Sequence, residues 1–300
     1  MSNNQLAFIF SAFTSDYADH PGRNITGFES VFHDFLLQAA ASADPELANF
    51  NFTENTFHKD ELLTQYLTYI YNCTVSLLLR KANVFPVMTA GYSMGIYAAL
   101  YDSGSVSFET GLTLIRMAYQ CMKASLKGKF FGMGTIIGLN EQDIRQLTNQ
   151  SSLRVEIANQ NATHSFVVSG YHDDIQILLA LATSEGALHT RELGVTIPYH
   201  SGYLIDGSED FSRMILQLKI STPVTPIISL LDQHLLTTPE SLREEITRNL
   251  FNPLNWFRTM QAMQQHQISG FIECGPSKGL ARNAKFVDGI KFFPLSSILP

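Results

Sequence analysis

The five residues Gly91-Tyr92-Ser93-Met94-Gly95 constrain the fold of this sequence more than any other segment. They follow the apolar run Val84–Ala90, which is typical of a buried strand, and they lead into the helical pattern Met94–Tyr101. Glycines two positions either side of a serine remove side chains that would clash in a strained strand-to-helix turn. Such a turn exposes the hydroxyl at a helix N-terminus, where main-chain N–H groups can bind an oxyanion. The segment therefore predicts that Ser93 is a nucleophile; the alternative is a serine that only caps the helix.

A serine hydroxyl is a weak nucleophile near neutral pH, so a nucleophilic serine needs a base. Of the nine histidines, His200 is the strongest candidate because it lies in the short, apolar, proline-containing segment Ile197–Gly202. Loops of this kind carry functional residues more often than the elements they connect. The alternative is a solvated or hydrogen-bonded histidine with no chemical role.

The order of the expected strands and helices predicts an α/β fold with an insertion. Strand-like runs alternate with helical patterns up to Ser125, and the rhythm changes at Lys127–Lys129. From Phe130 to Leu193 the expected order is strand, helix, strand, strand, helix, strand, which is the ferredoxin-like pattern. We therefore expect a large subdomain of residues 1–127 and 195–300, interrupted by a small subdomain of residues 128–194.

The composition excludes several classes of partner and cofactor. The chain has 300 residues, of which 45% are hydrophobic and 16% charged, enough to bury a large core. The net charge of −7 and the lack of a basic run argue against nucleic acid as a partner. No metal, nucleotide or redox-cofactor motif is found, so we expect neither a metal site nor a cofactor.

The cysteines and the N-terminus indicate a cellular location. The three cysteines, Cys73, Cys121 and Cys274, are widely spaced and match no disulfide or zinc pattern, which favours a reducing compartment. The first residues lack the charged region and cleavage site of a signal peptide, and no apolar run is long enough to span a bilayer. We therefore expect a cytoplasmic protein without a membrane span.

Six segments in order resemble the malonyl-CoA:acyl-carrier-protein transacylases and the acyltransferase domains of polyketide synthases. They are Gly91–Leu100 around the serine, Phe131–Leu139, the hairpin from Ile157–Asn161 to Phe166–Gly170, Pro198–Ser201 around the histidine, Asn252–Trp256, and Glu273–Leu280. The resemblance implies an α/β-hydrolase-like large subdomain with an inserted ferredoxin-like small subdomain. It also implies acyl transfer through an acyl-serine enzyme, with acyl-CoA and acyl carrier protein as substrates and partners. Docking of an acidic carrier protein on this acidic chain would need a local basic patch.

The resemblance assigns roles to individual residues. Ser93 would be the nucleophile and His200 its base, oriented by a main-chain carbonyl that we expect near Gly275-Pro276. The oxyanion donors would be the N–H groups of Met94 and Phe13. The expected substrate-binding positions are Tyr92, Ala118, Asn161 and Tyr199.

Two departures from the family pattern bear on the substrate. The usual glycine-rich N-terminal loop is replaced by Ser11–Asp16. On the expected helix Phe108–Met122, Ala118 stands where the family has the arginine that binds the malonyl carboxylate. Arg116 is two positions away, which turns its side chain by about 200° around an α-helix, so it should point away from the cleft. We therefore expect malonyl to be a poor substrate.

Several functions remain open at this point. A family member without the arginine could transfer a neutral acyl group, hydrolyse acyl groups from stalled carrier proteins in polyketide or fatty-acid biosynthesis, or keep ordinary malonyl transfer through another cation. Transfer and hydrolysis share the acyl-enzyme and differ only in whether a thiol or water reaches it. From a different class come a catalytically silent docking module of a synthase and a simple esterase.

Overall fold

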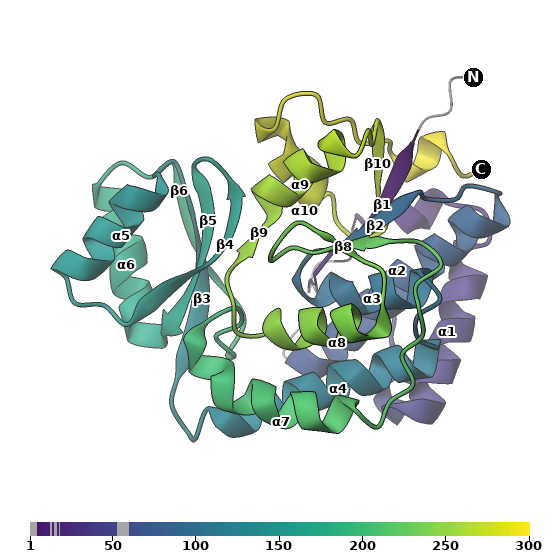
Figure 1. Cartoon of the computed structure of the whole chain (residues 1–300), viewed down its shortest axis with the longest axis horizontal. Helices are drawn as coiled ribbons and strands as arrows, with labels where there is room; N and C mark the ends of the chain where they lie inside the picture. Colours follow the sequence, from purple (N-terminus) through teal and green to yellow (C-terminus); the bar gives the residue numbers. More distant parts are fainter. Residues whose placement is uncertain (1–4, 13, 15–16, 18, 53–59) are drawn as a thin grey trace.

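The computed structural model describes residues 5–12, 14, 17, 19–52 and 60–300. Two five-stranded sheets organise this part of the chain. Figure 1 shows them as two bodies that lie side by side, with the smaller sheet and its two helices on the left and the remaining elements on the right. None of the helices in the described ranges has both the length and the apolarity needed to cross a bilayer.

The larger sheet has the strand order β10-β1-β2-β7-β8. Its parallel strands are β1 (Leu6–Phe10), β2 (Met88–Gly91), β7 (Ile227–Ile228) and β10 (Gly270–Glu273), and β8 (Leu235–Leu236) pairs antiparallel at one edge. The strands are mostly apolar, with Thr89 and Glu273 as buried polar exceptions, because helices cover both faces. The carboxyl ends of β1, β2 and β10 meet at one edge, which is where open α/β sheets place their ligand sites.

Two cores lie on opposite faces of the larger sheet. Phe8 and Phe10 of β1 enter the first core, whereas the alternate residues Ala7 and Ile9 enter the second. Trp256 and its neighbours from the C-terminal quarter of the chain fill the second core. The helices around this sheet are α1 (Phe28–Ser42), α2 (Glu61–Lys81), α3 (Ile96–Asp102), α4 (Phe108–Ser125), α7 (Ile205–Ile215), α8 (Pro239–Arg248), α9 (Trp256–Gln265) and α10 (Gly279–Asn283).

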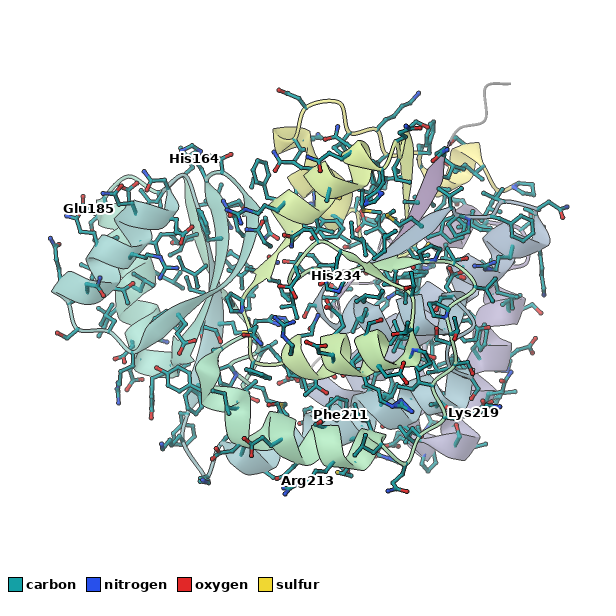
Figure 2. All side chains as sticks on the ribbon, in the orientation of Figure 1. His164, Glu185, Phe211, Arg213, Lys219 and His234 are labelled. Atoms are coloured by element: carbon teal, nitrogen blue, oxygen red, sulfur yellow. The ribbon has the colours of Figure 1, made fainter. Side chains whose placement is uncertain are left out.

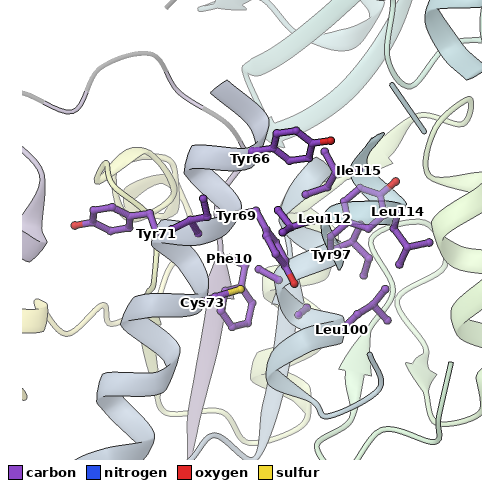
Figure 3. Packing of buried hydrophobic residues seen from close by; sticks show 14 of the residues in the cluster. Phe10, Tyr66, Tyr69, Tyr71, Cys73, Tyr97, Leu100, Leu112, Leu114 and Ile115 are labelled. Carbon is purple, nitrogen blue, oxygen red and sulfur yellow. The ribbon is translucent and has the colours of Figure 1, made fainter. Parts of the chain in front are cut away.

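Helix α2 runs through the middle of the first core and is buried on almost every side. Figure 3 shows aromatic residues of α2 meeting the side chains of α3 and α4. The Tyr69 ring stacks on Phe108 at a centroid distance of 5.3 Å, and its hydroxyl donates to the Phe108 carbonyl at 3.1 Å. A buried phenol of this kind needs such an acceptor. The packing fixes the middle of α2 relative to the start of α4.

The smaller sheet confirms the ferredoxin-like prediction. Its elements follow in the order β3 (Phe131–Ile137), α5 (Glu141–Gln150), β4 (Val155–Ala162), β5 (Ser165–Tyr171), α6 (His172–Ser184) and β6 (His189–Leu193). The four strands lie antiparallel in the order β6-β3-β5-β4, and both helices pack on one face over a separate core. The chain therefore has the expected fold class, an α/β-hydrolase-like body with a ferredoxin-like insertion.

One strand of the smaller sheet was not expected. β9 (Leu254–Asn255) comes from far along the chain and pairs parallel with β4 through Asn159 and Gln160. We keep residues 128–194 as the proposed small subdomain, with β9 joining it to the remainder. Short 3-10 helices complete the described structure: Pro21–Asn24, Pro45–Asn49, Ser93–Gly95, Gly202–Leu204, Ala284–Phe286 and Leu295–Ser297.

Candidate active site

Ser93 lies at the sharp turn between β2 and α3. Its φ of +53° is in the left-handed region, which is costly for a residue with a side chain and recurs at functional sites. The turn depends on the flanking glycines, because a Cβ at Gly91 would collide with the main chain of Ile96 and one at Gly95 with the Phe10 carbonyl. The short 3-10 helix Ser93–Gly95 then leads directly into α3. The predicted strand, turn and helix are thus all present.

His200 meets Ser93 although the two residues are far apart in sequence. Ser93 Oγ lies 2.7 Å from His200 Nε2. His200 Nδ1 lies 2.5 Å from the Asn249 main-chain oxygen. A carbonyl can only accept, so Nδ1 carries the proton and Nε2 is left to accept the proton of the serine hydroxyl. The expectation that the orienting carbonyl lies near Gly275-Pro276 is wrong, since Asn249 supplies it.

The end of α8 shapes the electrostatics of His200. Asn249 is the C-cap of α8, so its carbonyl lies at the negative end of the helix dipole, where a cationic imidazole is stabilised. His200 is only 4% exposed, and its burial lowers its pKa to about 4, while the Asn249 hydrogen bond acts in the opposite direction. The ring is therefore neutral at pH 7 and able to take a proton.

A cavity of about 290 Å³ opens beside the serine and histidine. Both subdomains contribute to its walls. It is lined by Ala12, Thr14, Glu61, Thr64, Tyr92, Ser93, Met133, Asn159, Val167, Arg191, Leu193, Gly194, Val195, Tyr199 and His200. Apolar area predominates, with a few polar groups, as expected of a small-molecule site.

Tyr92 and Tyr199 line this cavity, whereas Asn161 lies behind it. The Tyr92 hydroxyl donates to Asn161 Oδ1 at 2.8 Å, and Asn159 Nδ2 donates to the same oxygen at 3.1 Å. The Tyr92 ring packs edge-on against Trp256 at 5.5 Å. Asn161 therefore holds the Tyr92 side chain and, in this structure, has no place on the cavity wall.

Ala118 and Arg116 are both absent from the described lining of the cavity. Ala118 is buried in α4 with 1% exposure, and Arg116 is half-buried on the same helix. The cation that does line the cavity among the described residues is Arg191 of β6, an exposed residue that the sequence did not single out.

Glu61 is a second lining residue that the sequence gave no reason to select. It lies in the first turn of α2 beside the capping residue Asp60, where an acidic residue is ordinary. Burial raises the pKa of its carboxyl group, and hydrogen bonds from Thr196 and Tyr199 act in the opposite direction.

The two predicted oxyanion donors are the main-chain N–H groups of Met94 and Phe13. Met94 follows Ser93 in the 3-10 helix at the start of α3. Phe13 lies outside the described residues. Within the described residues there is no group of three or more histidine, cysteine, aspartate or glutamate side chains placed to hold a metal ion, and the three cysteines are buried and unpaired.

Comparison with known proteins places these features in a family context. No family model matches the chain. It is 25% identical over 234 residues to the malonyl CoA-acyl carrier protein transacylase of Bacillus subtilis strain 168, covering 74% of each chain. It is 29% identical over 220 residues to the polyketide biosynthesis malonyl CoA-acyl carrier protein transacylase PksC of the same organism, covering 72% of this chain and 75% of PksC.

Solved structures share the fold. The malonyl CoA-acyl carrier protein transacylase of Coxiella burnetii superposes with a TM-score of 0.87 at 24% identity, covering 98% of this chain and 94% of that one. A malonyl-transacylase solved in complex with a type II polyketide acyl-carrier protein also gives a TM-score of 0.87, at 19% identity and 98% and 99% coverage. In sequence and in fold the chain is therefore similar to the malonyl-CoA:acyl-carrier-protein transacylases, the family that its motifs resemble.

Proposed function

We propose that this protein transfers acyl groups from thioesters through an acyl-enzyme at Ser93. The observation that carries the proposal is the continuous chain of contacts from Ser93 Oγ to His200 Nε2 and from His200 Nδ1 to the Asn249 carbonyl, beside an apolar cavity. His200 takes the hydroxyl proton as Ser93 attacks the thioester carbon. The thiol then leaves with that proton, and an ester of Ser93 remains. A second thiol, or water, attacks the ester with His200 as base and releases Ser93.

The negative charge on the attacked carbonyl oxygen needs main-chain donors. We assign the N–H of Met94 to this role because it follows the nucleophile at a helix start, and we keep Phe13 as the second donor on the resemblance alone. The reaction uses protein groups only, so it requires no metal or redox cofactor. We propose acyl-CoA and acyl carrier protein as the substrates, and the cytoplasm as the location.

For the acyl group, we propose an uncharged chain in place of malonyl. No cation from α4 lies in the described lining of the cavity, and the resemblance puts Ala118 at the position of the carboxylate-binding arginine. A malonyl carboxylate would then be desolvated without a bidentate partner, which is costly. Two reactions fit this cavity: transfer of a neutral acyl group to a carrier protein, and hydrolysis of the thioester that links an acyl group to a carrier protein.

Ordinary malonyl transfer is the second candidate. Arg191 lines the cavity and could pair with a carboxylate, and the relatives above carry malonyl in their names. If this candidate is right, malonyl-CoA should load Ser93 efficiently and Arg191→Gln should weaken that loading about tenfold or more while sparing acetyl loading.

Intact-mass measurement tests these readings together. The protein is mixed separately with malonyl-CoA, acetyl-CoA and an acyl-loaded carrier protein, and both the Ser93 adduct and acyl loss from the carrier are followed. We expect an acetyl adduct that is absent in Ser93→Ala. Rapid acyl loss to water that also requires Ser93 would identify a hydrolase.

The reactivity of Ser93 distinguishes an enzyme from a catalytically silent docking module. A fluorophosphonate probe reacts only with an activated hydroxyl. No labelling of Ser93, together with no adduct from any thioester, would overturn the proposed enzyme.

A further inference from the structure

Glu61 places a carboxylate in the cavity that contains Ser93 and His200. It enters from the first turn of α2, and Thr64 one turn later on the same helix also lines the cavity. The hydrogen-bond partners of the Glu61 carboxylate are Thr196 and Tyr199, which lie in the segment leading to His200. The carboxylate therefore bridges α2 and the histidine segment within the space that an acyl group would occupy.

The hydrogen bonds around Glu61 all donate to it. Thr196 donates through its N–H at 3.2 Å and its hydroxyl at 3.1 Å to Oε2, and the Tyr199 hydroxyl donates at 3.1 Å to Oε1. The direction of the last bond is fixed because Gln65 Nε2 already donates to the Tyr199 oxygen at 2.9 Å. Three donors and no acceptor are the partners that an ionised carboxylate requires.

No ion pair within the described residues neutralises this charge. A cation with an electrostatic influence on it is Lys123 of α4, an exposed residue that does not line the described part of the cavity. Arg191 lines the cavity from the other subdomain but makes no described bond to Glu61. In the described part of the structure, Glu61 is thus a half-buried carboxylate of the cavity that accepts hydrogen bonds and has no ion-pair partner.

We propose that Glu61 is a specificity-determining residue that rejects acyl groups carrying a carboxylate and so limits the site to uncharged acyl groups. This rests on the proposed acyl transfer at Ser93 and names the residue that sets its substrate class. Two carboxylates in one partly desolvated space repel each other strongly. The same charge does not oppose an acetyl group or a longer alkyl chain. The repulsion acts in addition to the missing α4 cation and depends on a different residue.

The test is the ratio of malonyl to acetyl loading at Ser93, measured by intact mass at limiting times in wild type and Glu61→Gln. Glutamine keeps the size and can still accept a hydrogen bond, but it removes the charge. We expect the ratio to rise about tenfold or more in Glu61→Gln, mainly through faster malonyl loading. Glu61→Ala removes the same charge and provides the result if the glutamine variant does not fold.

Two control variants test whether the ratio depends on the charge of Glu61 itself. One removes a negative charge elsewhere in the protein, and the other changes a hydrogen-bond partner of Glu61 without removing its charge. Glu185→Gln removes one negative charge at the outer end of the small subdomain, where Figure 2 shows Glu185 far from the larger body, and the ratio should stay unchanged. Tyr199→Phe removes one donor to Glu61 but leaves the charge, so the ratio should stay low.

Three results would overturn the inference: an unchanged ratio in a folded Glu61→Gln, malonyl loading of wild type as fast as acetyl loading, or the same rise in Glu185→Gln. Failure of the proposed function looks different, because then no thioester loads Ser93 in wild type or in any variant. In that case the proposed selectivity of Glu61 would be wrong together with the proposed acyl transfer at Ser93.

Discussion

His200 Nδ1 lies 2.5 Å from the Asn249 main-chain oxygen, so the group that orients His200, the proposed base, is part of the backbone at the end of α8. In a Ser-His-Asp arrangement a side-chain carboxylate holds this position and can be deleted by mutation. Here the acceptor remains whatever side chain residue 249 carries. The same carbonyl fixes the tautomer that leaves Nε2 free to accept the Ser93 proton.

This arrangement predicts that substitutions of the two hydrogen-bonded residues, His200 and Asn249, differ greatly in their effect on the rate of acylation. His200→Ala should lower the rate of Ser93 acylation by about 10²–10⁴-fold, because the general base is lost. Asn249→Ala should keep the rate within about threefold, because the carbonyl is retained. Single-turnover acylation with acetyl-CoA measures both, and equal large losses in two folded variants would contradict a main-chain acceptor.

The low pKa of His200 predicts the acid limb of the pH profile. Burial lowers the pKa of His200 from 6.5 to about 4, so the ring stays neutral and basic through pH 5–8. The rate of Ser93 acylation should therefore be independent of His200 protonation down to about pH 5, and it should fall only as the pH drops through about 4. A half-maximal rate near pH 6.5 in the free enzyme would mean that His200 is solvated or is not the base.

Gly95, two residues after the proposed nucleophile Ser93, should not tolerate an added methyl group. A Cβ at Gly95 would collide with the Phe10 carbonyl, so Gly95→Ala should lower the free energy of unfolding by about 1–3 kcal/mol and displace Ser93. Urea unfolding and fluorophosphonate labelling measure the two effects. Gly194→Ala is the unfolding control, because an added Cβ there meets nothing within 4 Å. Equal stability of the two variants would contradict the tight turn.

Glu273 at the end of β10 should make stability depend on pH. Burial raises the pKa of its carboxyl group from 4.5 to about 7, against hydrogen bonds from the N–H groups of Leu280 and Ala281. The folded state thus keeps the proton that the unfolded chain has already lost. Stability from this group is complete below pH 4.5 and declines by about 3 kcal/mol as the pH rises through 7. Urea titrations should show that Glu273→Gln loses this decline; an unchanged slope would assign it to other groups.

The sequence predicted the parts of the structure that have a local pattern. The strand, turn and helix around Ser93 and the ferredoxin-like insertion both follow from the spacing of apolar residues and glycines. Helix α7 was not among the predicted elements; Gly207 near its start weakens the helical pattern of its sequence. In the structure, this glycine lets α7 approach α4, since a Cβ there would lie 2.8 Å from the Cys121 carbonyl.

The residues missed in the site share a different cause. The Asn249 carbonyl carries no sequence signal, because every residue has one. Glu61 and Arg191 look like an ordinary first-turn acid and an ordinary strand cation, and only the fold brings them to one cavity. Local patterns predicted the turn that carries Ser93, whereas the residues that would select its substrate are brought together by contacts between distant segments.

The pairing of β9 with β4 has a consequence for how substrates of different size are sorted. Leu254 and Asn255 join the sheet edge at Asn159 and Gln160, and the Trp256 N–H donates to Asn159 Oδ1 at 3.2 Å. Asn159 is itself a wall of the cavity, so main-chain pairing sets the spacing between its two sides. A hinge movement that widened the space would break these bonds. If Ser93 carries an acyl group as proposed, the length of that acyl group should depend on side-chain volume at wall positions such as Met133 and Val167, where redesign for bulkier acyl groups should begin.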